Sequence, residues 1–505
     1  MSIFNSIAYA VMKSRHTEVE RTINNPIEVQ NDVFHQLIAA GKDTEWGKKY
    51  DYGNIKSWED YNQKVPINEY DAFIPYIQRM QQGEQNLLWN SPITMFSKSS
   101  GTSGRVSKFI PVSHEALKQC HYKGGVDMLI IYCNMYSESN IFGGYNLALG
   151  GSKQSQPSDP YYCGDVSAII IDHLPRWAEM FRAPKREIAL MSEWESKLMR
   201  MAETTSTQNI VSLAGVPSWM ALLLQRCLDI TNKNHIGEVW KNLEVYFHGG
   251  VDFLPYKQKF KQLIPNPDMR YVNIYNASEG YFGIQDQHGV SDMLLLLNNG
   301  VYYEFIETCE LGKEQPKVTQ LQDVEIGKNY ALLLSTNAGL WRYLIGDTVT
   351  FTSKAPYRIQ ITGRTRNYIN VCGEELIEDN ANQAIKTACS ETNCMVKEYT
   401  AAPYLSADNK PVGHEWIIEF EQEPADKELF AELLDKALKA SNSDYEAKRY
   451  KNLILQKPVI NFVPNGTFMK WLKDNNKLGG QHKIPRLKNT REIIDEVFKH
   501  ANNEL

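Results

Sequence analysis

The stretch that decides the fold reads Ser99-Ser100-Gly101-Thr102-Ser103-Gly104-Arg105-Val106-Ser107-Lys108. Apolar runs flank it at Ile93–Phe96 and Lys108–Val112, which predicts a loop between two strands. Its two glycines allow the backbone to turn tightly and to approach a ligand closely. Hydroxyls, backbone N–H groups and a lysine together suit a polyphosphate, although the spacing of a Walker loop is missing. Read alone, the stretch is equally consistent with a surface turn.

Outward from this loop, apolar runs alternate with amphipathic stretches. We expect strands at Ala168–Ile171, Val245–Phe247, Tyr271–Ile274 and Met293–Leu297, and helices at Ile27–Ala40, His114–Ile131, Trp194–Thr204 and Ser218–Thr231. This alternation is typical of an α/β domain built on a largely buried sheet.

Two further regions follow. Between Val301 and Val371, short apolar runs separated by glycines predict antiparallel strands or a small barrel. Beyond Gly373, a helix, a strand and a helix are expected at Ile377–Thr387, Glu415–Glu421 and Ala425–Ser441. We therefore predict an α/β protein: a large N-terminal domain with a β-barrel-like part, residues 1–375, and a small α+β C-terminal domain, residues 376–505.

The composition is that of an ordinary globular protein, with 42% hydrophobic and 23% charged residues and a net charge of −6. A nucleic-acid partner would normally leave a basic domain, so none is expected. The longest apolar runs, such as Met128–Tyr132 and Trp219–Leu224, are too short to span a bilayer, and the N-terminus does not resemble a signal peptide. The eight cysteines form no Cys-x-x-Cys motif; Cys389 and Cys394 are the closest pair. We expect a cytoplasmic protein with reduced cysteines and no membrane partner.

A second motif, Tyr275-Asn276-Ala277-Ser278-Glu279-Gly280, follows the expected strand Tyr271–Ile274. A carboxylate at a strand end could hold a Mg²⁺ ion that bridges phosphate oxygens, and the ring of Tyr275 could cover a purine. The alternative is that Glu279 is a solvated loop residue.

Three more motifs carry single charged residues. Asp347 ends Gly339–Asp347 and enters a strand, where Asp is uncommon, so it could accept hydrogen bonds from ribose hydroxyls. Arg364, in Gly363–Asn367, could hold ribose or phosphate oxygens. A lysine in the glycine-containing segment Lys477–Arg486 could reach the transferring phosphoryl oxygens or the acyl carboxylate. Each of these residues could instead be a surface charge.

The order of the motifs is more specific than any one of them. It is similar to the layout of the ANL adenylating enzymes, which include acyl-CoA synthetases, peptide-synthetase adenylation domains and luciferases. Four segments resemble the motifs of the auxin-responsive-promoter acyl-acid amido synthetases, the Gretchen Hagen family: Ser99–Lys108, Tyr275–Gly283, Gly339–Asp347 and Gln481–Arg486. The resemblance covers nearly the whole chain, whose length is closer to that of bacterial members than of plant members.

The resemblance implies the ANL fold, ATP and Mg²⁺, and a set of site residues. Lys483 and Glu279 would be catalytic, and Glu279 would also face the metal. The ATP or AMP contacts would be Ser99, Ser100, Gly101, Thr102, Ser103, Lys108, Gly249, Gly250, Tyr275, Asn276, Ala277, Ser278, Asp347 and Arg364.

The sequence departs from the family pattern at three positions. His248 stands for the usual Thr in the segment that lines the adenine, His482 replaces a Tyr, and Leu376 falls where plant members carry a Lys. The acid pocket would include Val216, Trp219 and Met220, for which helical core is the alternative role.

The function that the resemblance implies has two steps. ATP adenylates a small carboxylic acid, and the acyl group then passes to an amine or amino acid after the C-terminal domain turns about a hinge near residues 366–380. Two alternatives stay open: an acid–thiol ligase that passes the acyl group to CoA, and a non-catalytic nucleotide-binding protein.

Overall fold

The computed structural model describes residues 15–99, 108–153, 155, 160–250, 253, 256–365, 368, 369, 371, 374, 376–406, 411–449, 455–475, 477 and 484–502. The chain divides into two compact units. Unit 1 comprises Met1–Gly250, Leu263–Ile345 and Val349–Ile361, and unit 2 comprises Val251–Gln262, Gly346–Thr348 and Thr362–Leu505. No helix in the described part of the chain is both long enough and apolar enough to cross a lipid bilayer.

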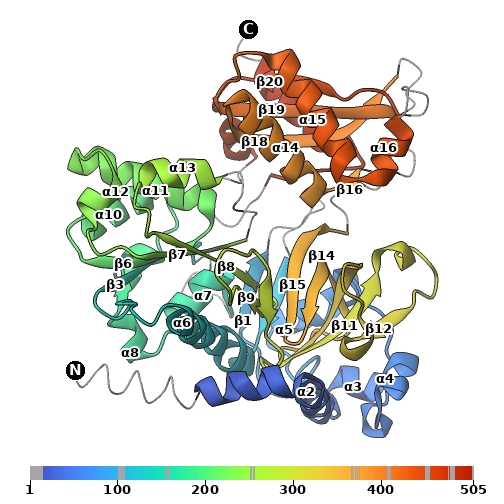
Figure 1. Cartoon of the computed structure of the whole chain (residues 1–505). Coiled ribbons are helices and arrows are strands. Elements are labelled where there is room, and N and C mark those ends of the chain that lie inside the picture. The colour runs from blue at the N-terminus through green and yellow to red at the C-terminus, as the bar shows by residue number, and fades with distance from the viewer. Residues whose placement is uncertain are drawn as a thin grey trace. The chain divides into compact units, whose positions relative to one another are not determined.

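Unit 1 begins with helices, of which α2, α3 and α4 lie together at the bottom of Figure 1. The helix expected at Ile27–Ala40 is α2, and Val33, Phe34 and Leu37 on its apolar face are buried. Ser57 starts α4 with a capping box to Asp60. The elements are α2 (Pro26–Gly41), α3 (Glu45–Lys49), η1 (Tyr52–Asn54), α4 (Trp58–Lys64), η2 (Tyr70–Ala72) and α5 (Ile74–Gln81).

A large sheet forms the centre of unit 1, with the strand order β12-β11-β13-β14-β15-β10-β9-β8-β7-β6-β3-β5. Its strands are β3 (Tyr145–Leu149), β5 (Arg182–Ala183), β6 (Ile210–Gly215), β7 (Val245–Gly249), β8 (Arg270–Ala277), β9 (Gly280–Ile284), β10 (Met293–Leu295), β11 (Val301–Glu307), β12 (Val318–Gln320), β13 (Asn329–Thr336), β14 (Tyr343–Lys354) and β15 (Tyr357–Arg364). β14 and β15 carry residues of both units.

The sheet has a parallel part and an antiparallel part. β5, β3, β6, β7 and β8 pair in parallel, whereas β8–β9, β9–β10, β10–β15, β11–β13 and β11–β12 are antiparallel. Of the two arrangements expected after Val301, these pairs support antiparallel strands. In register, Leu149 lies beside Gly215, Gly215 beside His248, and Gly249 beside Ile274. The carboxyl ends of β3, β6, β7 and β8 therefore share one edge, where open α/β sheets bind their ligands.

A separate three-stranded sheet has the order β2-β1-β4, with β1 (Met95–Ser99), β2 (Lys108–Val112) and β4 (Tyr162–Gly164). The other helical elements of unit 1 are η3 (Ala116–Tyr122), α6 (Lys123–Met135), α7 (Val166–Asp172), α8 (Arg176–Glu179), α9 (Arg186–Ala189), α10 (Trp194–Thr205), α11 (Pro217–Thr231), α12 (Ile236–Val239), η5 (Thr308–Glu310) and η6 (Leu321–Asp323).

The strand expected at Ala168–Ile171 is wrong, because these residues lie within helix α7. The helix buries Val166, Ala168, Ile169 and Ile171 and packs against β1. A short apolar run has no period that separates a buried strand from a buried helical turn, so the pattern alone was ambiguous.

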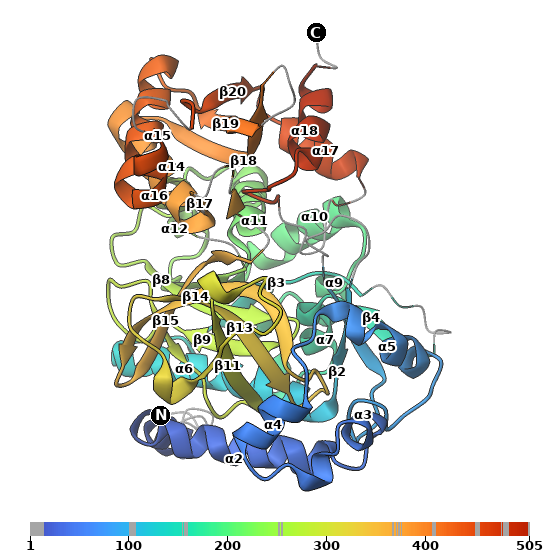
Figure 2. The ribbon, with the colours of Figure 1, turned by 90° about the vertical axis from the view of Figure 1, so that its right-hand side faces the viewer.

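Unit 2 contains a three-stranded sheet with helices on both faces. In Figure 2, α14, α15 and α16 lie on one side of β18–β20, and α17 and α18 lie on the other. The strand expected at Glu415–Glu421 lies within β19, and the helix expected at Ala425–Ser441 corresponds to α15. The elements are β16 (Tyr368–Ile369), β17 (Leu376–Ile377), α14 (Glu378–Thr392), β18 (Met395–Leu405), β19 (Pro411–Gln422), α15 (Lys427–Ser441), α16 (Ser443–Arg449), β20 (Val459–Val463), α17 (Thr467–Asp474) and α18 (Glu492–Asn502), and α13 (Lys257–Leu263) lies largely in unit 2.

A buried ion pair fixes the entry of the chain into β14. The guanidinium of Arg342 donates to both carboxylate oxygens of Glu304 on β11, each at 3.0 Å, and both side chains are almost fully buried. The same guanidinium donates to the carbonyl oxygen of Val65 at 2.7 Å, and the indole of Trp58 donates to Glu304 at 2.8 Å. Arg342 also has a positive φ of 44°. The pair thus joins α4, β11 and the start of β14.

A π-helical segment, η3, precedes α6 where one regular helix was expected. Cys120 accepts a hydrogen bond from the Tyr281 N–H at 3.2 Å, and the His121 ring nitrogen Nδ1 lies 3.3 Å from Asn276 Oδ1. Burial lowers the pKa of His121 to about 4, and the hydrogen bond to Asn276 offsets only part of this lowering. Such segments are rare and are frequent at functional sites. Here the segment holds the turn between β8 and β9.

The ion pair leads to a prediction about stability. Glu304→Gln leaves the guanidinium of Arg342 buried without its counter-charge, so we expect the free energy of unfolding to fall by about 3–5 kcal/mol. Denaturant unfolding followed by circular dichroism measures the change. Glu310→Gln, at the surface pair with Lys313, is the matched control and should leave the unfolding midpoint unchanged. Equal midpoints for the two variants would contradict the assignment.

His121 leads to a prediction about pH. Because its pKa is about 4 in the folded chain against 6.5 ordinarily, the unfolded chain binds the proton first as the pH falls. The free energy of unfolding should therefore fall by about 1.5 kcal/mol from this group as the pH drops from about 6.5 to about 5. Denaturant unfolding at both pH values measures the fall, which should be smaller by that amount in His121→Gln. The same pH dependence in both proteins would refute it.

Candidate functional site

The two ends of the hydroxyl- and glycine-rich loop lie opposite each other. Ser99 ends β1 and pairs in register with Lys108, the first residue of β2. Between them, Ser100, Gly101, Thr102 and Ser103 belong to residues 100–107, which lie outside the described residues. On β1, the buried hydroxyl of Ser97 lies 2.9 Å from that of Ser278, so the base of the loop is tied to the second motif.

Lys108 and Glu279 both interact with Tyr70 through their charges. The ammonium of Lys108 donates to the hydroxyl of Tyr343 at 3.0 Å and lies 5.5 Å from the ring centre of Tyr70. Burial raises the pKa of Tyr70, and the negative charge of Glu279 adds to the effect. The Tyr70 hydroxyl accepts a hydrogen bond from the N–H of Phe109 on β2 at 2.6 Å. Lys108 and Glu279 therefore both lie in the neighbourhood of Tyr70 in unit 1.

The residues before Glu279 have different environments. Ser278 bonds Ser97, and Asn276 faces His121, so both side chains have partners within the fold. The ring of Tyr275 is 5% exposed and meets Phe282 edge to face, with 4.9 Å between the ring centres. Its role as the cover of a purine stays a prediction. Ala277 ends β8 and is partly buried.

At the carboxyl end of β7, the backbone needs glycine. A Cβ atom at Gly249 would lie 2.3 Å from the carbonyl oxygen of Ile274, and Gly250 has a φ of +85°. The backbone at these two glycines therefore lies close to β8, next to Tyr275. Burial lowers the pKa of the preceding His248 to about 3, so its imidazole is neutral at neutral pH.

The predicted acid-pocket residues follow β6. Val216 directly precedes α11, and Trp219 and Met220 lie in its first turn. Met220 is fully buried, whereas Trp219 is partly exposed and meets Trp194 of α10, with 3.9 Å between the ring centres. Helical core, the alternative role, describes Met220 better than Trp219.

Lys197 was not singled out from the sequence, although it is a buried lysine next to this edge. Its ammonium donates to the carbonyl oxygens of Gly150 and Gly151, each at 2.8 Å, directly after β3. Burial lowers its pKa to about 8. Its only signal in the sequence is a lysine on the apolar face of α10, among Leu198, Met201 and Ala202.

In unit 2, the structure brings together the two residues predicted for the ribose. The guanidinium Nε of Arg364 lies 2.9 Å from Asp347 Oδ1, and the side chain of Asp347 is 9% exposed. The N–H of Thr365 donates to the carbonyl oxygen of Gly346 at 2.8 Å, and Gly346 has a φ of +94°. The glycine and this bond fix β14 against the end of β15.

The C-terminal motif is anchored by a residue whose role was not predicted. Lys483 and His482 lie outside the described residues, but Arg486 is buried. Its guanidinium forms an ion pair with Glu398 on β18 and donates to the carbonyl oxygen of Tyr399 at 3.2 Å. The hydroxyl of Tyr256 donates to Glu398 at 3.1 Å. Leu376, which stands where plant members carry a Lys, is fully buried in β17.

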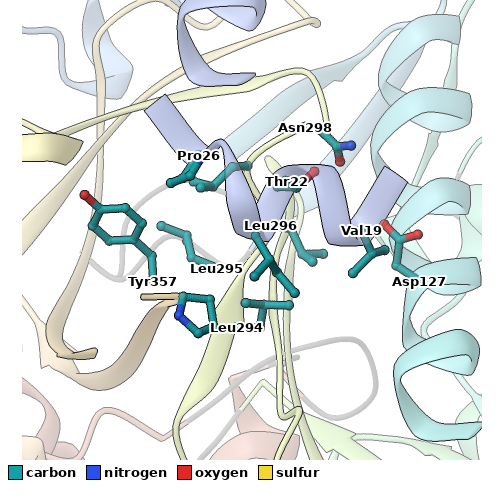
Figure 3. A pocket seen from close by; sticks show the side chains of 12 residues that line it. Val19, Thr22, Pro26, Asp127, Leu294, Leu295, Leu296, Asn298 and Tyr357 are labelled. Atoms are coloured by element: carbon teal, nitrogen blue, oxygen red, sulfur yellow. The ribbon is translucent and has the colours of Figure 1, made fainter. Parts of the chain in front are cut away.

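Among the described residues, no three His, Cys, Asp or Glu side chains gather as a protein-only metal cage would require. A small, open pocket lies elsewhere in unit 1, between the helix that contains Val19 and Thr22 and the apolar run Leu294–Leu297 (Figure 3). None of the predicted site residues lines it, so it does not belong to the candidate site.

Three domain models of one protein family match most of this chain. The GH3 family N-terminal domain matches residues 15–269, the GH3 family central domain residues 294–364, and the GH3 family C-terminal domain residues 379–492. Indole-3-acetic acid-amido synthetase GH3.4 of Arabidopsis thaliana is 24% identical over 93% of this chain and 90% of its own. Putative indole-3-acetic acid-amido synthetase GH3.9 of the same plant is 26% identical, with 94% of each chain covered.

Solved structures show the same fold. The AtGH3.15 acyl acid amido synthetase in complex with 2,4-DB has a TM-score of 0.80 at 16% identity, covering 97% of this chain and 96% of that one. A 2-hydroxyisobutyryl-CoA ligase in complex with 2-HIB-AMP has a TM-score of 0.60 at 12% identity, covering 94% and 91%. The predicted α/β fold of the adenylating enzymes is therefore confirmed. Because the family domains match the chain in order from residue 15 to residue 492, this protein belongs to the GH3 family.

Proposed function

We propose that this chain joins a small carboxylic acid to an amino acid through an acyl-adenylate formed from ATP. The observation that carries the proposal is the match of all three GH3 domains in order. The predicted enzyme class, an ATP-dependent acid–amino acid ligase, is confirmed by this family and by the amido synthetases it resembles. The acid, the amine and the residue roles that follow are the proposed part.

Three groups of residues would contact the nucleotide. Asp347 accepts hydrogen bonds from the ribose hydroxyls, and Arg364 supports it or holds a phosphate oxygen. Gly249, Gly250 and the backbone of Tyr275–Ala277 lie beside the adenine, because glycine allows the backbone to approach a flat ring closely. The hydroxyls and N–H groups of Ser99, Ser100, Gly101, Thr102 and Ser103, together with Lys108, hold the phosphates.

In the first step, a carboxylate oxygen of the acid attacks the α-phosphorus of ATP. A new phosphorus–oxygen bond forms, the bond to the β-phosphate oxygen breaks, and pyrophosphate leaves. The ammonium of Lys483 stabilises the negative charge that develops on the phosphoryl oxygens, and the loop N–H groups act in the same way. Positioning of the two reactants lowers the barrier further.

Glu279 would hold Mg²⁺. One carboxylate combined with substrate phosphates suits this ion, which usually keeps several waters and needs no protein cage. When bound, it supplies charge neutralisation for the phosphates. Glu279, whose negative charge adds to the raised pKa of Tyr70, supplies such a carboxylate.

In the second step, the amine nitrogen attacks the acyl carbon, AMP leaves, and the nitrogen loses a proton. Residues 376–505 turn about a hinge near residues 366–380 to admit the amine. Glu374, within this segment, is held in unit 2: it accepts a hydrogen bond from the Val371 N–H at 2.7 Å and lies 2.8 Å from His414 Nε2 on β19. The acid lies near Val216, Trp219 and Met220.

The first test is acid-dependent exchange of pyrophosphate into ATP over a panel of carboxylic acids. At least one acid should support exchange, because adenylation is reversible. The same preparation with the best acid is then given amino acids or CoA, and the products are identified by mass spectrometry. An amide with an amino acid is expected. A thioester alone would replace the proposal by the acid–thiol alternative, and no exchange with intact ATP binding would favour the non-catalytic one.

The second test separates Asp347 from its partner. Asp347→Ala should weaken ATP binding by about 10–100-fold, the size of one or two lost hydrogen bonds to a charged group. Because Asp347 pairs with Arg364, Arg364→Ala and the double variant are measured as well. This double-mutant cycle separates the loss of a contact to the nucleotide from the loss of the ion pair. Isothermal titration calorimetry gives the affinities. Unchanged affinity in Asp347→Ala would refute the ribose assignment.

A further inference from the structure

Two cysteines, neither of which takes part in the proposed reaction, lie at the end of helix α14. Cys389 lies in the last turn of the helix, and Cys394 directly precedes Met395, the first residue of β18. Between them, Asn393 adopts a left-handed conformation with a φ of 49°. A left-handed residue at this place is the usual way for a helix to end.

The backbone of this helix end links the same two cysteines. The N–H groups of both Asn393 and Cys394 point to the carbonyl of Cys389, and the bond from Cys394 is 3.2 Å long. A bond that spans six residues in this way defines the Schellman motif, in which the side chains of the first and sixth residues commonly make contact. In most helices that contact is between apolar side chains. Here both positions are cysteine.

The helix end brings the two thiols near each other, and both are partly exposed, so small molecules can reach them. A hydrogen bond between the two thiols lowers the pKa of Cys394 and raises that of Cys389. The Thr392 hydroxyl lies 3.3 Å from Cys394 Sγ. Both cysteines are partly exposed, and their neighbours Ser390, Glu391 and Asn393 are exposed.

The other described cysteines differ, including the partly exposed Cys133, whose pKa is raised to about 11 by burial. Cys120, Cys163 and Cys227 are buried, and burial raises the pKa of Cys120 and of Cys227 to about 12. Cys309 is exposed, but its pKa is raised, chiefly by desolvation and further by the charge of Glu307. Because the thiolate is the reacting form, Cys394 is the best nucleophile among them.

We propose that Cys389 and Cys394 form a reversible redox site that closes to an intramolecular disulfide by exchange with a low-molecular-weight disulfide. The Cys394 thiolate attacks one sulfur of the small disulfide, forming a mixed disulfide and releasing one thiolate. The Cys389 thiol gives its proton to that thiolate, and its sulfur attacks the sulfur of Cys394. The second small thiolate leaves and takes a proton from solvent. The two protein thiols are oxidised, and the small disulfide is reduced to two thiols.

Closure would join the last turn of α14 to the beginning of β18. That strand carries Glu398, the partner of Arg486. The crosslinked loop spans only residues 389 to 394, so closure restrains this junction and leaves the rest of the chain unconstrained. The site is independent of the proposed ligase reaction.

The test uses the full-length chain and a series of ratios of oxidised to reduced glutathione, followed by acid quenching, alkylation and trypsin digestion. Both cysteines lie on one peptide, Thr387–Lys397, because Lys386 and Lys397 flank them. As the ratio rises, this peptide should lose both alkyl groups together and show a mass lower by two hydrogen atoms. Alkylation of both cysteines at every ratio would overturn the proposal.

Single variants test the order of attack, and circular dichroism confirms that each one folds. Cys389→Ser should accumulate a glutathione adduct on Cys394, because the second thiol is missing. Cys394→Ser should leave Cys389 fully alkylated. Cys309→Ser removes an exposed cysteine without a neighbouring thiol and should close like the unaltered chain. A stable adduct in the unaltered chain, or equal adducts in the first two variants, would also overturn the mechanism.

Discussion

The structure of unit 1 depends on a rule about buried charge: a guanidinium can leave water only if its charge and its hydrogen bonds are satisfied. Arg342 meets that rule by drawing together α4, β11 and the residue that begins β14. That residue is Tyr343, whose hydroxyl accepts the hydrogen bond of Lys108. The ion pair therefore fixes the start of β14, to which a lysine more than two hundred residues earlier in the chain binds.

Local patterns were enough to predict much of this fold. The helix at α2, the strands around the hydroxyl loop and the small C-terminal α+β region follow from periodicity and from glycine positions. The segment Ala168–Ile171 was wrong because four apolar residues carry no period. His121, Lys197 and the Glu398 partner of Arg486 were missed for another reason. Each acts through a residue distant in the sequence, and no local pattern records such a contact.

The sequence indicated several residues of the candidate site but not the contacts between them. Residue types at strand ends indicated Glu279, Asp347 and Arg364, and the structure places the last two 2.9 Å apart. The roles predicted for these residues came from the order of the motifs along the chain, because no single motif is specific enough. Placing Lys108 beside Tyr70 required the three-dimensional fold, because an ammonium against two aromatic rings depends on strand pairing that the sequence does not specify.

Lys197, which donates to two carbonyl oxygens directly after β3, bears on which positions of this enzyme can accept new side chains. A Cβ atom at Gly150 would lie 2.8 Å from Ser167 Oγ, and one at Gly151 would lie 1.8 Å from Asp165 Oδ2, while Lys197 occupies both carbonyl oxygens. There is therefore no room for a larger side chain at Gly150 or Gly151, at this edge of the sheet. The first turn of α11 has no such restriction at Trp219, which is partly exposed. With the acid placed as proposed, mutational libraries aimed at new acids would vary the first turn of α11 and leave Gly150 and Gly151 unchanged.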